Sequence, residues 1–226
     1  MGNAIEEMNS KRVKHLLSLE ALPEICAFLD RPLTEVSGDL AFALDLRSHY
    51  LLAVLDGTGH GPGAGLDALM VASSIMGRCS FPRGLVWPNE VLQGLQVWKE
   101  LQETWGEMAV MFLALVDREH REMHYCRGVS YFPPPWLNTN GRVYQLNGVN
   151  EAGAYCGRLS LGDQATLLVA TDGIAHMSHV GDKTYWEARG KDLALGTDPS
   201  KIVREIEADA LGCESRDDQL ALAILL

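Results

Sequence analysis

The residues best suited to chemistry in this chain are aspartates at the ends of short apolar runs. Four such sites stand far apart in the sequence: Asp39, Asp56, Asp172 and the pair Asp217–Asp218. Short apolar runs bounded by turn residues are typical of buried strands, and strands of one sheet can bring distant carboxylates together. Oxygen ligands favour a hard divalent ion, Mg²⁺ or Mn²⁺, over zinc. The pattern therefore predicts a site for two such ions.

Asp56 has the most informative surroundings of these acids. It follows the apolar run Tyr50–Leu55 and leads into the glycine-rich segment 58–65, after which residues 64–76 are expected to form a helix. No lysine or arginine lies between Arg47 and Arg78 to neutralise a carboxylate at the mouth of a sheet. A bound cation explains an acid at this place, whereas Asp-Gly alone is also common in simple turns.

Four motifs follow one another in an order that resembles a known family. They are Ser37-Gly-Asp39, Asp56-Gly-Thr-Gly-His-Gly61, Thr171-Asp-Gly173 and Asp217-Asp218. Their order is similar to that in the PPM family of metal-dependent protein serine/threonine phosphatases. The resemblance is strongest to the bacterial branch with the sporulation phosphatase and the stressosome feedback phosphatases, and it covers roughly residue 33 to the C-terminus.

The resemblance implies roles for five residues at two Mn²⁺ or Mg²⁺ ions. Asp56 would bridge both ions, and the Gly57 carbonyl would bind one of them. Asp172 and Asp217 would bind the other ion, while Asp39 would support the Gly57 side directly or through water. The ions would share a hydroxide that attacks phosphorus in line, so Asp56, Asp172 and Asp217 would be the catalytic residues.

Asp218 and His60 have open roles beside this set. Motif order favours Asp217 as the ligand and leaves Asp218 as a possible support behind the ligands. His60 could protonate the leaving alkoxide or simply pack against the glycine loop. Family members with a proposed histidine acid carry it two residues after the metal aspartate, where this chain has Thr58.

The implied activity is that of a hydrolase acting on phosphoserine or phosphothreonine, with phosphorylated STAS-domain stressosome proteins as substrates. No covalent intermediate is expected, because none of the five cysteines has an arginine six residues on, as a nucleophilic-cysteine motif requires. Two other functions stay open. One is a catalytically silent PPM-fold binding module, and the other is a nucleotide-binding protein that uses the glycine loop, although Asp56 would repel a pyrophosphate.

Composition limits the remaining possibilities. A chain of 226 residues with 47% hydrophobic residues can bury a sizeable core, so residues 1–226 are expected to form one phosphatase domain. The net charge of -11 argues against nucleic acid or an anionic membrane as partner. Scattered cysteines and the lack of a signal-like or membrane-spanning apolar run indicate reduced thiols and a cytoplasmic location.

The expected elements combine hairpins with runs of helix. Strands over 40–46 and 49–55, joined at 47–48, would place Asp39 beside Asp56, because neighbouring strand ends meet in an antiparallel pair. Further expected elements are helices over 5–17, 90–104 and 199–211, a hairpin about 117–120, strands around residue 136 and over 142–146, and a final strand over 219–226. This order predicts an α+β fold, a four-layer α-β-β-α sandwich of two mainly antiparallel sheets.

Substrate recognition has to be explained without a basic cluster. The stretches 77–88 and 175–198 show little periodicity and contain Trp87, Tyr185 and Trp186. Exposed aromatic side chains there would anchor a folded phosphoprotein, whereas the alternative is that these rings are buried beneath the loops.

Overall fold

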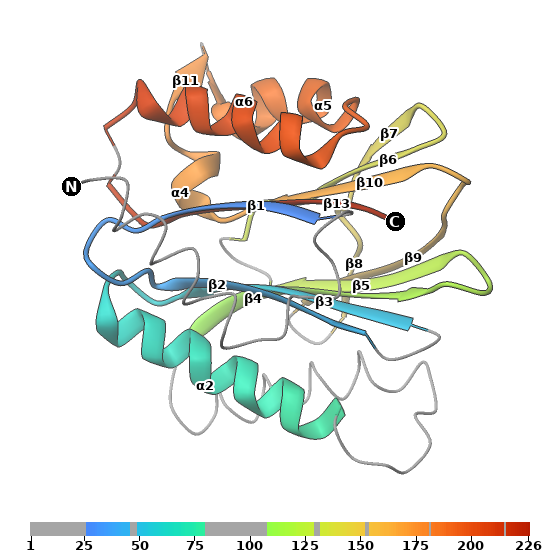
Figure 1. The fold of residues 1–226 in the computed structure, drawn as a ribbon, viewed down its shortest axis with the longest axis horizontal. Coiled ribbons are helices and arrows are strands. Elements are labelled where there is room, and N and C mark those ends of the chain that lie inside the picture. The colour runs from blue at the N-terminus through green and yellow to red at the C-terminus, as the bar shows by residue number, and fades with distance from the viewer. Residues whose placement is uncertain are drawn as a thin grey trace.

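A computed structural model describes residues 26–45, 49–79, 108–128, 132–151, 154–180, 182–214 and 216–226. Within these ranges two antiparallel sheets stack face to face, and helices cover the outer face of each sheet (Figure 1). The predicted four-layer α-β-β-α sandwich is therefore confirmed.

One sheet has six strands in the order β2-β3-β4-β5-β9-β8. The strands are β2 (Asp39–Asp45), β3 (His49–Gly57), β4 (Ala109–Asp117), β5 (Glu122–Gly128), β8 (Val149–Glu151) and β9 (Ala154–Ser160). The two predicted hairpins, β2–β3 and β4–β5, form four adjacent strands of it, with β2 at the edge. Strands β3 and β4 are almost continuously apolar, because both faces of this sheet are covered.

The other sheet has five strands in the order β1-β13-β10-β6-β7. The strands are β1 (Cys26–Arg31), β6 (Trp136–Thr139), β7 (Arg142–Gln145), β10 (Ala165–Ala170) and β13 (Gln219–Leu225). The C-terminal strand β13 is central, as its apolar sequence predicts, and it lies between β10 and β1. Strand β1 is a difference from the sequence-based expectation, which placed the first strand at residue 40.

Helix α2 (Pro62–Cys79) covers the six-stranded sheet, whereas α4 (Asp172–Ala175), α5 (Tyr185–Ala194) and α6 (Pro199–Leu211) cover the other sheet (Figure 1). Helix α6 begins as predicted, because the Asp198 side chain accepts hydrogen bonds from the N–H groups of Ser200 and Lys201. The small strands β11 (His179–Val180) and β12 (Lys183–Thr184) pair with each other.

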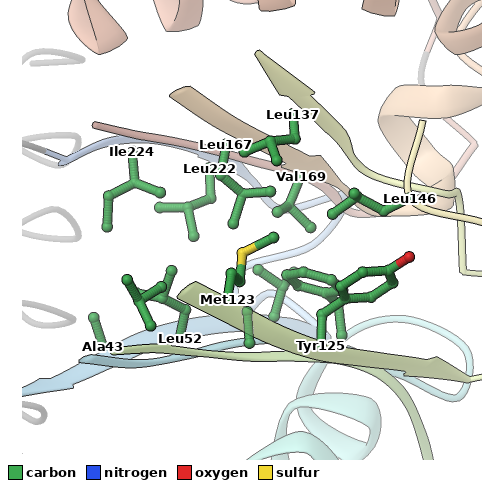
Figure 2. Close-up of a cluster of buried hydrophobic side chains, with 14 of the residues drawn as sticks. Ala43, Leu52, Met123, Tyr125, Leu137, Leu146, Leu167, Val169, Leu222 and Ile224 are labelled. Carbon is green, nitrogen blue, oxygen red and sulfur yellow. The ribbon is translucent and has the colours of Figure 1, made fainter. Parts of the chain in front are cut away.

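Three apolar layers hold the sandwich together. The middle layer lies between the sheets, where Leu52 and Met123 face Leu167 and Leu222 (Figure 2). A second layer fills the space between α2 and the six-stranded sheet, and a third lies beneath α4, α5 and α6. Burial in three layers supplies the main stabilisation, at about 25 cal/mol for each Å² of apolar surface removed from water.

The stretch 175–198 differs from the sequence-based expectation. It contains α5, whose capping box is formed by Thr184 and Glu187. Trp186 is only 1% exposed and donates from Nε1 to the Pro134 carbonyl, while Tyr185 is 3% exposed and donates to Asp209. Of the two alternatives for these rings, burial is confirmed for Tyr185 and Trp186, because packing and hydrogen bonds both hold them inside.

Three sequence-based expectations concern residues that the structure does not describe. The N-terminal helix over 5–17, the helix over 90–104 and Trp87 lie outside the described residues. No helix among the described residues is long and apolar enough to cross a membrane.

Candidate metal centre

Asp39 and Asp56 meet at one end of the β2–β3 hairpin. They occupy directly opposite positions in the antiparallel register. Side chains at directly opposite positions point to the same face, with Cβ atoms about 4.5–5.5 Å apart. The predicted juxtaposition is confirmed, and it places two carboxylates side by side at an edge where Asp39 is only 8% exposed.

The second sheet brings its acids to the same place. Strand β10 ends at Ala170 and β13 begins at Gln219 beside it, so Asp172 and Asp217 lie at neighbouring strand ends. Asp172 is the first residue of α4. The charges of Asp172 and Asp217 both act on Asp56, which shows that the two sheets contribute to one acidic cluster.

Thr171 joins the two sheets at this cluster. Its hydroxyl donates to Asp39 Oδ2 at 2.7 Å and accepts from the Leu220 N–H at 3.1 Å. Thr171 is fully buried, and a charge-assisted hydrogen bond in such a place is strong. The backbone of Leu220 therefore contributes to this link between the sheets.

Asp218 links its own loop, before β13, to two other loops behind the cluster. It is 1% exposed, and its carboxylate accepts from the N–H groups of Leu33 at 2.5 Å, Gly38 at 2.6 Å and Gly61 at 3.4 Å. These donors belong to the loop before Asp39 and to the glycine loop after Asp56. The side chain of Asp218 thus faces backbone amides, which satisfy its charge without a cation.

Glycines permit the close packing of these loops. A Cβ atom at Gly38 would lie 2.8 Å from Ala64 Cβ and 2.9 Å from Asp218 Oδ2. A Cβ atom at Gly173 would overlap the Asp218 carbonyl. The glycines next to Asp39 and Asp172 are therefore required by the approach of neighbouring chain segments.

The electrostatics of the cluster favour a bound cation. Burial, followed by the charge of Asp56, raises the pKa of Asp39, and the hydrogen bond from Thr171 opposes this shift. Burial, followed by the charges of Asp172 and Asp217, likewise raises the pKa of Asp56. Burial and the charge of Asp217 raise the pKa of Asp172, while His176 opposes the shift. Mutual repulsion of buried carboxylates is what a divalent ion relieves.

The residues fit an ion that retains much of its water. No group of three or more His, Cys, Asp or Glu side chains in the described ranges is arranged so that it could hold a metal ion. Mg²⁺ commonly takes only one or two protein carboxylates and keeps several waters, so a cluster spread over two sheets suits it better than it suits zinc. The acids Asp39, Asp56, Asp172 and Asp217, with the Gly57 carbonyl, are the oxygen donors available.

Two histidines near the cluster are exposed. His60 stands on the glycine loop with an exposed side chain. His176 follows α4 and acts on Asp172 only through its charge. Neither histidine is part of the buried network.

Asp30 is a further acid that sequence reasoning missed. Asp30 is the last residue but one of β1, and the charge of Asp218 acts on it. One of its carboxylate oxygens, Oδ1, is buried without a hydrogen-bond partner among the described residues. Burial is the main cause that raises its pKa to about 6. The missed strand β1 explains the omission, since a single acid at the end of an apolar run gives no signal of its own.

The same end of the sandwich contains a hydrogen-bonded link to β1 through Gln219. Arg31 donates to Gln219 Oε1 at 3.0 Å, and Gln219 Nε2 donates to the Gly173 carbonyl at 3.3 Å. The Arg31 guanidinium therefore holds the backbone beside Asp172 through Gln219.

The fold and the acid cluster define a PPM-type sandwich, in which two antiparallel sheets bring carboxylates to one edge. An antiparallel sandwich also removes the dinucleotide-binding alternative, because that fingerprint belongs to a parallel sheet. The family model for Stage II sporulation protein E (SpoIIE) matches residues 47–225. The chain belongs to this family.

Solved structures show the same fold at low sequence identity. The SiaA-PP2C domain of Pseudomonas aeruginosa has a TM-score of 0.74 at 18% identity, over 100% of this chain and 96% of that one. The PP2C phosphatase domain of SpoIIE from Bacillus subtilis, with a fragment of its regulatory domain, has a TM-score of 0.72 at 16% identity, over 89% and 63%. RsbX in complex with magnesium has a TM-score of 0.61 at 14% identity, over 89% and 94%. No curated protein sequence matches the chain.

Proposed function

We propose that this protein is a metal-dependent protein serine/threonine phosphatase. The observation that carries the proposal is the bond from Thr171 to Asp39, which joins the two sheets where Asp39 stands opposite Asp56. A buried set of mutually repelling carboxylates lowers the stability of the fold. Such a set is expected where the carboxylates bind divalent cations, because the cations offset the repulsion. Membership of the SpoIIE family and the RsbX structure with magnesium support Mn²⁺ or Mg²⁺ as the cofactor.

Each residue of the acidic cluster would have a part in this reaction. The residues that would hold the ions are Asp39, Asp56, Asp172, Asp217 and the carbonyl of Gly57. When bound, the ions would activate water and neutralise charge on the phosphoryl oxygens. Thr171 holds the Asp39 carboxylate in one orientation. Asp218 fixes the backbone on both sides of the acids, so that the ligands are set before the substrate arrives.

We infer that the substrates are phosphoserine or phosphothreonine residues on folded STAS-domain proteins of bacterial stress signalling. A solved structure of similar fold, with 19% identity and a TM-score of 0.62, is described under the bacterial stressosome, and this likeness supports the stress-signalling class. The net charge of -11 would repel a free acidic phosphopeptide, so the shape of a folded substrate should contribute to binding. With Trp186 buried, the exposed apolar side chains beside the cluster are Leu33, Val36 and Leu66.

Val36 lies against Gly65 in the first turn of α2, and Leu66 is the next residue of that helix. A Cβ atom at Gly65 would be 3.3 Å from Val36 Cγ1, and Leu66 is the next residue and is 57% exposed. The same helix end packs against Gly38 and Gly57 of the cluster. These side chains would therefore contact a folded protein whose phosphate enters the site.

The test is to incubate the purified chain with phosphorylated STAS-domain proteins and manganese and to follow which phosphate is released. Release that stops in a chelator and in Asp56→Asn would support the proposal. The matched control is Asp163→Asn, because Asp163 is an exposed acid in the turn before β10 and should keep full activity. Equal release with and without metal would refute the proposed mechanism.

The competing possibility is a catalytically silent binding module of the same fold. Such a module would bind the phosphorylated partner and release no phosphate under any metal. Binding without turnover, measured in the same samples, would therefore replace the enzymatic proposal. The acids at positions 39, 56, 172 and 217 favour the enzyme, since a module without activity needs none of them.

A further inference from the structure

Cys126 and Cys156 form a close pair of thiols on the six-stranded sheet. They are directly opposite residues of the antiparallel strands β5 and β9. Their sulfur atoms are 2.7 Å apart, and both residues are thiols and not halves of a disulfide. The sequence gives no local signal for this contact, because the two residues are 30 positions apart.

The backbone geometry of this pair suits a covalent bond. Directly opposite residues of an antiparallel pair have Cα atoms about 4.5–5.5 Å apart. Disulfides usually have Cα atoms about 4.4–6.8 Å apart, so the strands need no displacement to accept one. The sulfur atoms are already within an ångström of the covalent S–S distance of about 2.05 Å.

The two thiols differ in their access to water. Cys126 is 4% exposed and belongs to the apolar layer beneath α2, whereas Cys156 is partly exposed beside that layer. An oxidant from solution therefore reaches Cys156 first. The buried Cys126 thiol, 2.7 Å away, is then placed to react with the oxidised sulfur at a high effective concentration.

We propose that Cys126 and Cys156 are a reversible modification site, which a peroxide closes to a disulfide between β5 and β9. In the first step the Cys156 thiolate attacks one oxygen of hydrogen peroxide, which forms the sulfenic acid and releases hydroxide. In the second step the Cys126 sulfur displaces the hydroxyl group, so the S–S bond forms and water leaves. The two thiols lose two electrons and two protons, and the peroxide becomes two waters.

Two other cysteines in the described part of the chain, Cys26 and Cys213, are placed differently. Burial raises the pKa of Cys26 to about 12, which keeps its thiol protonated and unreactive. Cys213 lies at the end of α6 and its thiol donates to the Asp209 carbonyl at 3.5 Å. Cys213 is partly exposed, as Cys156 is, and therefore serves as a control for simple exposure.

The experiment uses the full chain, denatured and alkylated before and after treatment with hydrogen peroxide. Five cysteines should be alkylated before treatment and two fewer afterwards, with the loss reversed by dithiothreitol. Peptide mapping should find Cys126 joined to Cys156. Cys213→Ser should not change the formation of the bond, whereas Cys156→Ser should abolish it.

A second variant keeps the proposal testable if the first folds poorly. In Cys126→Ser the oxidised Cys156 has lost the thiol opposite it on β5, so a sulfenic-acid trap such as dimedone should label Cys156 and should leave it unlabelled in the unmodified chain. Unchanged alkylation of both thiols after peroxide, or a linkage to a different cysteine, would overturn the proposal. None of these measurements depends on phosphatase activity, so the result stands apart from the proposed function.

Discussion

Asp39 and Asp56 stand directly opposite each other on β2 and β3, with Thr171 of the other sheet bonded to Asp39. Like charges at directly opposite positions destabilise an antiparallel pair. Burial raises the pKa of both carboxyls, so the metal-free protein keeps a strained arrangement of charge at this edge. The consequence is that stability and the proposed activity should respond in opposite directions when one acid is neutralised.

The first prediction concerns Asp56→Asn. The change removes a buried charge that neighbouring Asp172 and Asp217 repel, so the metal-free variant should be as stable as the unmodified chain or more stable. Metal-dependent phosphate release should be lost, because an amide does not bridge two cations. Thermal unfolding in a chelator and turnover with manganese measure the two effects. A variant that unfolds more easily without metal would contradict the repulsion described here.

The second prediction concerns Thr171→Val. The substitution leaves Asp39 without its donor and the Leu220 N–H without its acceptor, so unfolding in urea should become easier by about 1–3 kcal/mol. More manganese should be needed for half-maximal activity, since the Asp39 carboxylate is no longer oriented. Thr171→Ser keeps the hydroxyl and is the matched control. Equal behaviour of the valine and serine variants would show that the bond is unimportant.

The third prediction is a pH dependence that Asp30 causes. Its pKa is about 6 in the folded protein against an ordinary value of 3.8, so the folded state binds the proton more tightly. Stability is therefore lost as pH rises from about 4 through about 6, by about 2–3 kcal/mol. Asp30→Asn should be more stable than the unmodified chain at pH 8, and this advantage should shrink towards pH 4.

Urea unfolding in a chelator at several pH values tests the role of Asp30. The exposed Asp163→Asn variant provides the comparison, because it should show no such gain. A constant difference between Asp30→Asn and the unmodified chain across this pH range would mean that the charge on Asp30 is not the cause.

The fourth prediction concerns substrate recognition by Leu66. Its exposed side chain lies at the start of α2 beside the cluster, so Leu66→Ser should raise KM for a folded phosphoprotein several-fold. Hydrolysis of a small aryl phosphate should stay unchanged, because that substrate reaches only the metal site. Leu211→Ser is the control, since Leu211 is also exposed but lies at the far end of α6. If both leucine variants act alike on the folded substrate, Leu66 has no special role.

Sequence patterns were sufficient where the structure is local. The β2–β3 and β4–β5 hairpins, the capped helix α6 and the central strand β13 all follow from apolar runs, turn residues and caps within a few positions. The meeting of Asp39 and Asp56 also follows, because an antiparallel hairpin fixes which ends are neighbours. Motif order then indicated the family, and the match over residues 47–225 confirmed it.

Tertiary packing decided the features for which the sequence has no local signal. Thr171 reaches Asp39 across 132 positions and Asp218 reaches Gly38 across 180, since both contacts depend on how the two sheets stack. The same packing buries Trp186 of α5 against the five-stranded sheet and sets Cys126 against Cys156. A pattern of apolar and polar residues determines that strands form and which faces they bury. Which side chains then touch across the sandwich depends on the register and stacking of distant strands, and these arise only when the whole core is packed.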